Sequence, residues 1–483
     1  MHGAVHLLHV YAAGDPVQLT DAIRRNPMSP YQWVIVALCI LLTMVDGYEI
    51  LVTAFTLPAM TEYFDLGKGQ QGLVASFGTL GMGIGAIFLS PLADRIGRRK
   101  HILFSLALIV VGMVLAGLAT SFESFLAFRF FGGLFLGGIV PSVSVLVAEY
   151  SNQKRRGAVM GLYGIGLPLG AAIGGFLSVA LIDAFTWRGP YFFSAIVTAV
   201  LLVVTWLVLP ESVDFLVEKR PAGALKAYNK IAAKVGAQQA TELPAARSAG
   251  AQQGGFVAGA LRGIMLRRTI LLWIAYSLMI AAFYFANSLT AKLVTEATGN
   301  ADFGITAQAL VAAGGVIGAL LFSLAARRIH PRVVTAIIGF LGFGIFFAFA
   351  AFFDDKTMVL VLAVLVGLAV NGGVAAYYAI SPSIYPIAIR AAAVGLMMGL
   401  GRAVAFFAPN LATFLQGQGL TPSGLYRVYA VILVLSGVAV YLLHATYRGA
   451  HSRDAMDEED DTANAAYDLA ETERSARVVD ASR

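Results

Sequence analysis

The stretch that decides the fold is GIGAIFLSPLADRIGRRKHILFSLALIV, residues 83–110, in which a short basic loop separates two apolar runs. The runs extend over residues 71–93 and 101–120, and about 20 apolar residues suffice to cross a bilayer as a helix. Gly97 permits a tight reversal between them, because a residue without a Cβ atom accepts unusual backbone angles. The pattern therefore predicts two membrane-spanning helices joined on one side of the membrane.

The same alternation of apolar runs and polar breaks continues along the chain. Of its 483 residues, 58% are hydrophobic and 13% are charged, whereas about a quarter of an average soluble domain is charged. We therefore predict an all-α membrane protein with twelve transmembrane helices. The predicted spans are residues 31–56, 71–93, 101–120, 125–148, 158–183, 190–209, 269–292, 305–326, 333–352, 358–384, 391–415 and 425–447.

A long internal repeat relates the two parts of the chain. Tyr150 and Arg155 recur 235 positions later as Tyr385 and Arg390, and several glycines share this offset. A parallel duplication of six-helix halves explains the spacing and places the substrate site between the halves, near the middle of the membrane. The expected domains are an N-terminal tail (1–30), an N-terminal half (31–209), a middle loop (210–268), a C-terminal half (269–447) and an acidic C-terminal tail (448–483).

The distribution of lysine and arginine predicts the orientation in the membrane. If the N-terminus is cytoplasmic, the segments on that side carry 27 of these residues and the segments on the other side carry five. Short translocated loops avoid lysine and arginine, so we expect both termini in the cytoplasm. Residues 1–30 lack the pattern of a secretory signal, and the first span is expected to remain as a helix.

Several motifs resemble those of a known transporter family. The loop PLADRIGRRK, residues 91–100, closely resembles the signature between helices 2 and 3 of the major facilitator superfamily of secondary transporters. Residues 129–157 resemble the helix 4 pattern of that superfamily. DGYE, residues 46–49, resembles the D-G-x-D motif in helix 1 of the aromatic acid:proton symporters, although Glu49 stands where that family usually has Asp.

This resemblance covers nearly the whole chain, because LPES at 209–212 and residues 386–402 also fit that group and the neighbouring sugar porters. It implies the major facilitator fold, with two pseudo-symmetric six-helix halves, and a multi-pass protein of the bacterial inner membrane. It also implies that the loop after the second helix forms an inner gate, in which arginines pair with Glu149 across the helix ends. The gate residues implied in this way are Asp94, Arg95, Gly97, Arg98, Arg99 and Glu149.

Asp46 and Glu49 lie inside the first apolar run, where an ionised side chain costs about 2.5 kcal/mol or more to insert. Three residues apart, they project from one face of the helix. Two neighbouring carboxyls in a low dielectric resist ionising together, so we expect one of them to accept a proton and to couple protons to transport. The alternative is an ion pair that only packs the bundle. Gly47 serves either close helix packing or a locally unwound stretch beside the substrate.

Arg129 and Arg402 are basic residues that lie within predicted spans. Arg129 falls within about 10 Å of the depth of Asp46 and Glu49, so we expect those carboxylates to provide its counter-charge. It either modulates the proton site or forms a fixed structural pair, and Asp46 and Arg129 are also candidate substrate contacts. Arg402 lies near mid-depth without an acidic neighbour in its half. Its planar fork suits a carboxylate, and the alternative is that it binds backbone carbonyls.

Polar and aromatic side chains of the C-terminal half complete the predicted substrate site. At these depths such side chains can hydrogen-bond a phenol or a carboxylate and stack on a ring. Taken singly, each of them is more often a packing residue. The residues are Tyr284, Asn287, Asn371, Tyr377 and Tyr378.

The features together predict proton-coupled uptake of an aromatic carboxylate, of hydroxybenzoate or phenylpropanoate size, by alternating access between the two halves. The alternatives are symport of another organic acid or a sugar, and a proton-driven exporter. The sequence has no P-loop for ATP and no nucleophile–base set that predicts an enzyme. The expected partners are a small organic anion, a proton and the lipid bilayer. We expect no cofactor, no metal and no nucleic acid, and a protein that works as a monomer.

Overall fold

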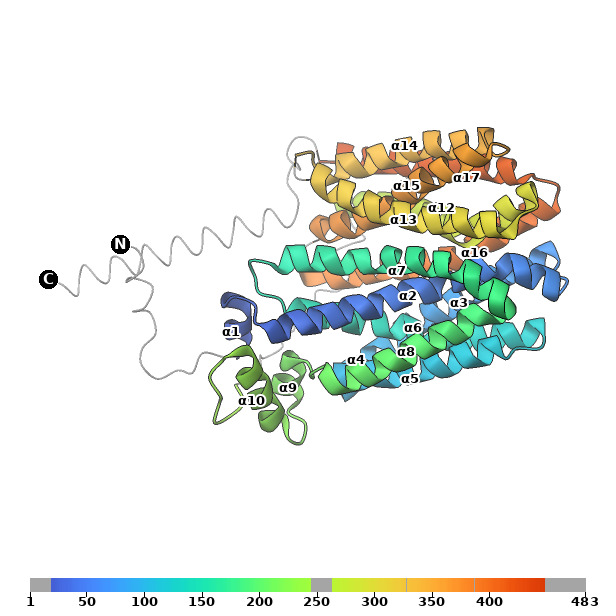
Figure 1. The fold of residues 1–483 in the computed structure, drawn as a ribbon. Helices are drawn as coiled ribbons and strands as arrows, with labels where there is room; N and C mark the ends of the chain where they lie inside the picture. Colours follow the sequence, from blue (N-terminus) through green and yellow to red (C-terminus); the bar gives the residue numbers. More distant parts are fainter. Residues whose placement is uncertain (1–18, 245–262, 327, 386, 448–483) are drawn as a thin grey trace. The chain divides into compact units, whose positions relative to one another are not determined.

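The computed structural model describes residues 19–244, 263–326, 328–385 and 387–447, and these residues form helices without a strand (Figure 1). Among them are twelve long helices, which confirms the predicted all-α membrane fold. They are α2 (Pro30–Tyr63), α3 (Lys68–Phe88), α5 (Arg98–Gly117), α6 (Phe122–Glu149), α7 (Arg156–Phe185), α8 (Gly189–Val208), α12 (Gly263–Thr298), α13 (Ala301–Ala325), α14 (Pro331–Ala351), α15 (Lys356–Ile384), α16 (Ile387–Gly417) and α17 (Pro422–Ala445).

Length and composition mark these helices as membrane spans. Eleven segments of the described chain are long and apolar enough to cross a membrane. The longest of them, Leu162–Val208, contains both α7 and α8. A short 3₁₀ helix, η1 (Thr186–Arg188), separates these two helices, so the segment crosses the membrane twice.

The helices are grouped in two compact units. The division passes through α2, α3 and α7, so the end of α2 and the start of α3 belong to a different unit from the rest of the N-terminal half. Unit 1 comprises Met1–Val52, Phe77–Ala171 and Leu181–Ala249, and unit 2 comprises Thr53–Ser76, Ala172–Ala180 and Gly250–Arg483.

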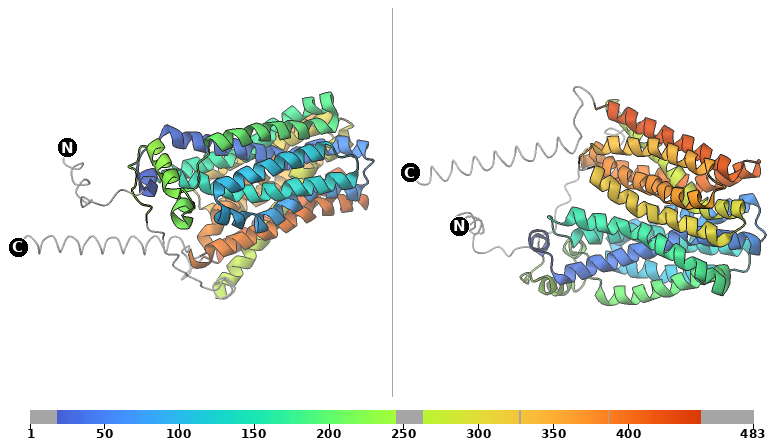
Figure 2. Two further views of the ribbon diagram at one scale, coloured as in Figure 1. Left: turned by 90° about the horizontal axis from the view of Figure 1, so that it is seen from below. Right: turned by 45° about the horizontal axis from the view of Figure 1, so that its top comes forward.

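Glycines let the helices of each unit approach closely. In unit 1, a Cβ atom on Gly85 of α3 would lie 1.7 Å from the carbonyl oxygen of Leu134 on α6. In unit 2, a Cβ atom on Gly367 of α15 would lie 1.7 Å from the carbonyl oxygen of Val311 on α13. Close approach of small residues is the main source of helix association in a bilayer, where lipid tails are as apolar as the side chains. In unit 2, α13 accordingly packs along α15, and α14 along α17 (Figure 2).

Short helices form one end of unit 1. They are α1 (Leu19–Arg25), α9 (Val213–Lys219) and α10 (Ala224–Val235), which lie side by side in Figure 1. The Leu19 amide donates to the Tyr228 hydroxyl of α10 over 2.8 Å, so the part of the expected N-terminal tail that holds α1 is packed against helices of the predicted middle loop. A further short helix, α4 (Ser90–Ile96), precedes α5. The predicted acidic tail, residues 448–483, lies outside the described residues.

Candidate functional site

The two carboxylates of α2 lie in the interior of unit 1. Asp46 is 6% exposed and Glu49 is 1% exposed. The helix continues through Gly47 between them, and a Cβ atom on that glycine would lie 1.9 Å from the carbonyl oxygen of Leu167 on α7. Gly47 therefore serves close packing of α2 against α7, and α2 is not unwound there. Tyr163 of α7 interacts electrostatically with Asp46.

The Glu49 carboxylate receives two hydrogen bonds from α8. Ser194 Oγ donates over 2.9 Å and Thr198 Oγ1 over 2.7 Å, both to Oε1 of Glu49. The other oxygen, Oε2, is buried and has no hydrogen-bond partner among the described residues. Sequence reasoning missed both α8 residues, because serine and threonine carry no charge that would mark them in an apolar span.

Arg129 of α6 lies beside Glu49 but contacts its main chain. It is 4% exposed, and its Nη2 donates to the Glu49 carbonyl oxygen over 3.0 Å. The Nη1 atom faces the Met113 sulfur at 3.4 Å, and the guanidinium lies 5.7 Å from the centre of the Tyr191 ring. Within the described chain, no carboxylate lies within 4.0 Å of this guanidinium. Glu49 is thus a counter-charge at longer range rather than a direct ion-pair partner.

Unit 2 holds a partly buried arginine among tyrosines. Arg402 of α16 donates from Nη1 to the Tyr284 hydroxyl of α12 over 3.1 Å. Tyr378 of α15 and Tyr276 of α12 also interact electrostatically with the guanidinium. The rings of Tyr276 and Tyr378 lie 6.3 Å apart at 44°. The described residues include no acidic side chain in ion-pair contact with Arg402, so its neighbours are phenols.

Two of the predicted substrate residues, Tyr284 and Tyr378, therefore lie at Arg402, and three others use their polar groups elsewhere. Asn287 donates to the Phe283 carbonyl oxygen and Asn371 to the Gly367 carbonyl oxygen, each one turn back on its own helix. The Tyr377 hydroxyl is hydrogen-bonded to Ser436 Oγ at 2.7 Å.

Tyr276 was not predicted as a site residue. It lies eight residues before Tyr284, about two helical turns away, so this spacing from Tyr284 could have indicated it.

The predicted gate residues other than Glu149 lie at the junction of α4 and α5. Arg98 pairs with Glu149 at the end of α6 and donates to Ser212 Oγ over 2.8 Å. The structure thus brings together the arginine and the glutamate that were expected to pair. Arg95 is exposed, and the side chain of Asp94 lies outside the described part of the structure.

Gly97 and Arg99 connect this junction to the segment after α8. Gly97 has a φ of +101°, and a Cβ atom there would lie 2.5 Å from Oε2 of Glu211. The Arg99 amide donates to Oε1 of Glu211 over 3.0 Å, and Arg99 Nε donates to the Leu209 carbonyl oxygen over 2.7 Å. Glu211 is therefore a further member of the gate cluster. Its position in the LPES motif was the signal that could have identified it.

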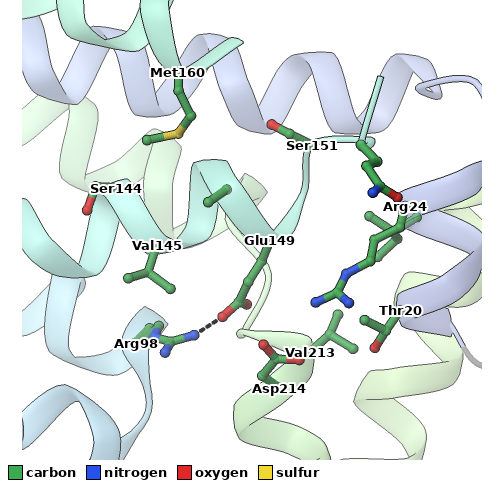
Figure 3. Close-up of a pocket in the computed structure, with 13 residues that line it drawn as sticks. Thr20, Arg24, Arg98, Ser144, Val145, Glu149, Ser151, Met160, Val213 and Asp214 are labelled. Atoms are coloured by element: carbon green, nitrogen blue, oxygen red, sulfur yellow. Dashed lines mark hydrogen bonds and ion pairs between the residues drawn. The ribbon is translucent and has the colours of Figure 1, made fainter. Parts of the chain in front are cut away.

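A cavity of about 490 Å³ lies beside the gate cluster in unit 1 (Figure 3). Its wall includes the Arg98–Glu149 pair, Arg24 of α1 and Asp214 of α9. The volume is in the range of small-molecule pockets. Two of the predicted gate residues, Arg98 and Glu149, thus line the cavity.

A second polar network joins the start of α3 to α12 and α16 within unit 2. Lys68 Nζ lies 2.5 Å from Oε1 of Glu296, and Lys292 Nζ lies 3.5 Å from the same oxygen. Gln416 donates to Oε2 of Glu296 over 2.6 Å and accepts a hydrogen bond from Lys292. We call these four residues the α3 latch. Lys292 is only 2% exposed, so its ammonium depends on these partners.

Comparison with known proteins agrees with this architecture. The twelve long helices of the described residues define a polytopic membrane protein. The sequence model of the Major Facilitator Superfamily matches residues 36–332. The chain belongs to that superfamily, and it is a transporter rather than an enzyme.

Relatives of this chain are known in bacteria. The 4-hydroxybenzoate transporter PcaK of Pseudomonas aeruginosa is 29% identical over 425 residues, which are 87% of this chain and 94% of that protein. The gallate transporter of Pseudomonas putida is 29% identical over 411 residues, which are 84% of this chain and 90% of that protein. Among solved structures, the xylose transporter XylE of E. coli in a partially occluded inward open conformation has a TM-score of 0.66 at 16% identity, covering 85% of this chain and 99% of that one. The last likeness establishes the fold alone.

Proposed function

We propose that this protein takes up an aromatic carboxylate together with protons, by alternating access, across the bacterial inner membrane. The relatives support the substrate class, because chains about 29% identical over most of their length are transporters of 4-hydroxybenzoate and of gallate. Both compounds combine a carboxylate with a phenol ring. The protein works as a monomer with both termini in the cytoplasm.

The observation that carries the proposal is the environment of Arg402. A guanidinium that is partly withdrawn from solvent at mid-depth of the membrane favours a counter-charge. Its neighbours among the described residues are the phenols of Tyr284, Tyr378 and Tyr276. A carboxylate substrate supplies the missing charge through the planar fork. The three tyrosines supply ring faces for stacking and hydroxyls for a substrate hydroxyl. Arg402, Tyr284 and Tyr378 are therefore the proposed substrate contacts that the structure groups together.

Asp46 and Glu49 serve as the proton-coupling pair in this proposal. Both are almost fully buried on one helix, where two ionised carboxylates would be costly. A proton bound from outside neutralises the pair and favours closure of the loaded transporter. Arg129, which contacts the main chain at Glu49, favours the ionised form and hence the release of the proton inside.

The membrane orientation expected from the lysine and arginine distribution assigns each polar network to one side of the membrane. The gate cluster of Arg98, Glu149 and Glu211 then lies on the cytoplasmic side and closes the inner entrance. The α3 latch, Lys68, Lys292, Glu296 and Gln416, then lies on the outer side. In this proposal, the two networks alternate in closing the path.

The experiment is uptake into proteoliposomes with an imposed pH gradient, acidic outside, with labelled 4-hydroxybenzoate as the probe. Symport predicts accumulation above the external concentration and its collapse when a protonophore is added. Failure to accumulate the acid under the gradient contradicts uptake by symport. Accumulation that instead needs an acidic interior identifies a proton-driven exporter.

A thermal-shift screen tests the substrate class independently. A ligand that binds only the folded protein raises its melting temperature. Hydroxybenzoates and phenylpropanoates should stabilise the purified protein, and aliphatic acids and sugars should not. Stabilisation by a dicarboxylate or by xylose instead would overturn the aromatic assignment.

A further inference from the structure

We propose that Ser194 and Thr198 of α8 are positioning residues for the proton on Glu49, and that they set the external pH at which the transporter loads it. The inference rests on the proposed proton-coupled uptake and deepens it. It assigns a role to two uncharged residues of a helix that contributes no other candidate to the proton site.

The geometry focuses both hydroxyls on one atom. Ser194 and Thr198 are four residues apart on α8 and so occupy the same face of the helix. Both residues have 0% exposure, and both donate to Oε1 of Glu49, at 2.9 and 2.7 Å. Two independent donors converging on one buried carboxylate oxygen form a built site rather than an incidental contact.

The other groups around Glu49 leave its carboxylate dependent on these donors. Asp46 repels it from the same helix, and Tyr163 of α7 lies beside Asp46. Arg129 of α6 donates to the Glu49 carbonyl and attracts the carboxylate only at longer range, with the Tyr191 ring of α8 beyond it. From α5, the neighbour of Arg129 is the thioether of Met113. Hydrogen bonds to the ionised form of an acid favour that form, so the two hydroxyls oppose uptake of a proton.

The same hydroxyls have a second set of acceptors when Glu49 is protonated. In a helix, a serine or threonine hydroxyl can donate to the carbonyl oxygen four residues earlier. For Ser194 and Thr198 these are the carbonyls of Pro190 and Ser194. The pair can therefore release the neutral acid without leaving its own polar atoms unsatisfied and without admitting water. The two hydroxyls of α8 therefore stabilise the ionised form of Glu49 without preventing its protonation.

The test compares Thr198→Val and Ser194→Ala with the parent in proteoliposomes. The initial rate of 4-hydroxybenzoate uptake is measured against external pH, and counterflow exchange is measured in parallel. Each variant removes one hydrogen bond to a charged group, which corresponds to a shift of about one pH unit. The alkaline limb of the uptake profile should move upward by that amount, and the maximal uptake rate should fall because the proton leaves less readily inside. Exchange, which needs no net proton release, should remain.

Two further variants separate positioning from packing. Thr198→Ser keeps the hydroxyl and should restore the parent profile. Thr205→Val is the matched control: Thr205 is also on α8 and fully buried, seven residues beyond Thr198, and its hydroxyl has no partner among the described residues. Its profile should equal that of the parent.

The outcomes are distinct from those of the proposed function. If the parent shows no proton-driven uptake, the proposed function fails. If the parent does and the profiles of Thr198→Val and Ser194→Ala equal it, the positioning role is wrong. Thr198→Ser and Thr198→Val behaving alike would also overturn it, because a packing role does not need the hydroxyl. If Thr198→Val fails to assemble, the profile of Ser194→Ala decides by itself, since both residues share one acceptor.

Discussion

Substituting Gly47 by alanine tests whether the contact of α2 with α7 positions the proton-coupling pair. A Cβ atom at this position would lie 1.9 Å from the Leu167 carbonyl oxygen, whereas ordinary van der Waals contact begins at 3.4 Å. The two helices must therefore separate locally by about 1.5 Å. The obstructing atom belongs to the main chain, so no side-chain rotation relieves the clash.

The size of the effect follows from this displacement. Overpacking a close contact costs about 1–3 kcal/mol, which a folded membrane protein can tolerate. A shift of about 1 Å in a positioned group can reduce a rate by about 10²-fold. Gly47→Ala should therefore insert and fold, melt at a lower temperature than the parent, and lose ten- to hundredfold in proton-driven uptake.

The assay is uptake per mole of reconstituted protein, together with the melting temperature in detergent. Gly164→Ala is the matched control, because Gly164 is on α7 and a Cβ atom there meets nothing within 4 Å. The control should match the parent in both measurements. If Gly47→Ala behaves like Gly164→Ala, the close approach at Leu167 does not position the carboxylates and the reasoning is refuted.

Three further predictions concern the charged clusters. Arg402→Lys should weaken substrate affinity by about tenfold or more, because a point charge cannot reproduce a bidentate contact; an unchanged dissociation constant in a binding titration would contradict this. Asp46→Asn should abolish accumulation against a gradient and spare counterflow exchange in the same proteoliposomes; persistent accumulation would show that Asp46 is not the coupling residue. Glu296→Gln removes the anion of the α3 latch and should favour the outward-open state. The reporter is an Asn410→Cys variant, because Asn410 hydrogen-bonds to Ser76 of α3, and an impermeant thiol reagent should label it faster when Glu296→Gln is present. Equal labelling rates would refute the latch.

The helices were predictable from the sequence because hydropathy reports directly on membrane crossing. The residues at which the helices begin and end were less predictable. The predicted span 269–292 became α12, Gly263–Thr298, because a helix continues past the apolar core wherever its polar ends remain hydrogen-bonded. Hydropathy also could not reveal α1, whose Leu19 depends on a contact with Tyr228, more than two hundred residues away in sequence.

The sequence allowed each charged site residue to be predicted, but it did not reveal which side chains lie beside that residue. Depth alone placed Arg402 in the middle of the membrane, but the direction of each tyrosine depends on how its helix is rotated by packing. Tyr377 and Tyr378 are adjacent on α15, yet one bonds Ser436 and the other lies at Arg402. The rotation of each helix about its axis cannot be predicted from a single sequence, because tertiary packing sets it.

The uncharged donors explain how this bundle tolerates its buried charges. In unit 1, Asp46 and Glu49 outnumber Arg129, and Glu49 is held by neutral hydroxyls. In unit 2, the partly buried Arg402 lies beside three neutral phenols. Neutral donors and acceptors orient a charge but leave it uncompensated. Under the proposed function, one proton neutralises the excess carboxylate of unit 1 and one substrate carboxylate neutralises Arg402. The cargo itself then completes the charge balance of each unit, and the loaded protein can close around a site that the empty protein cannot cheaply bury.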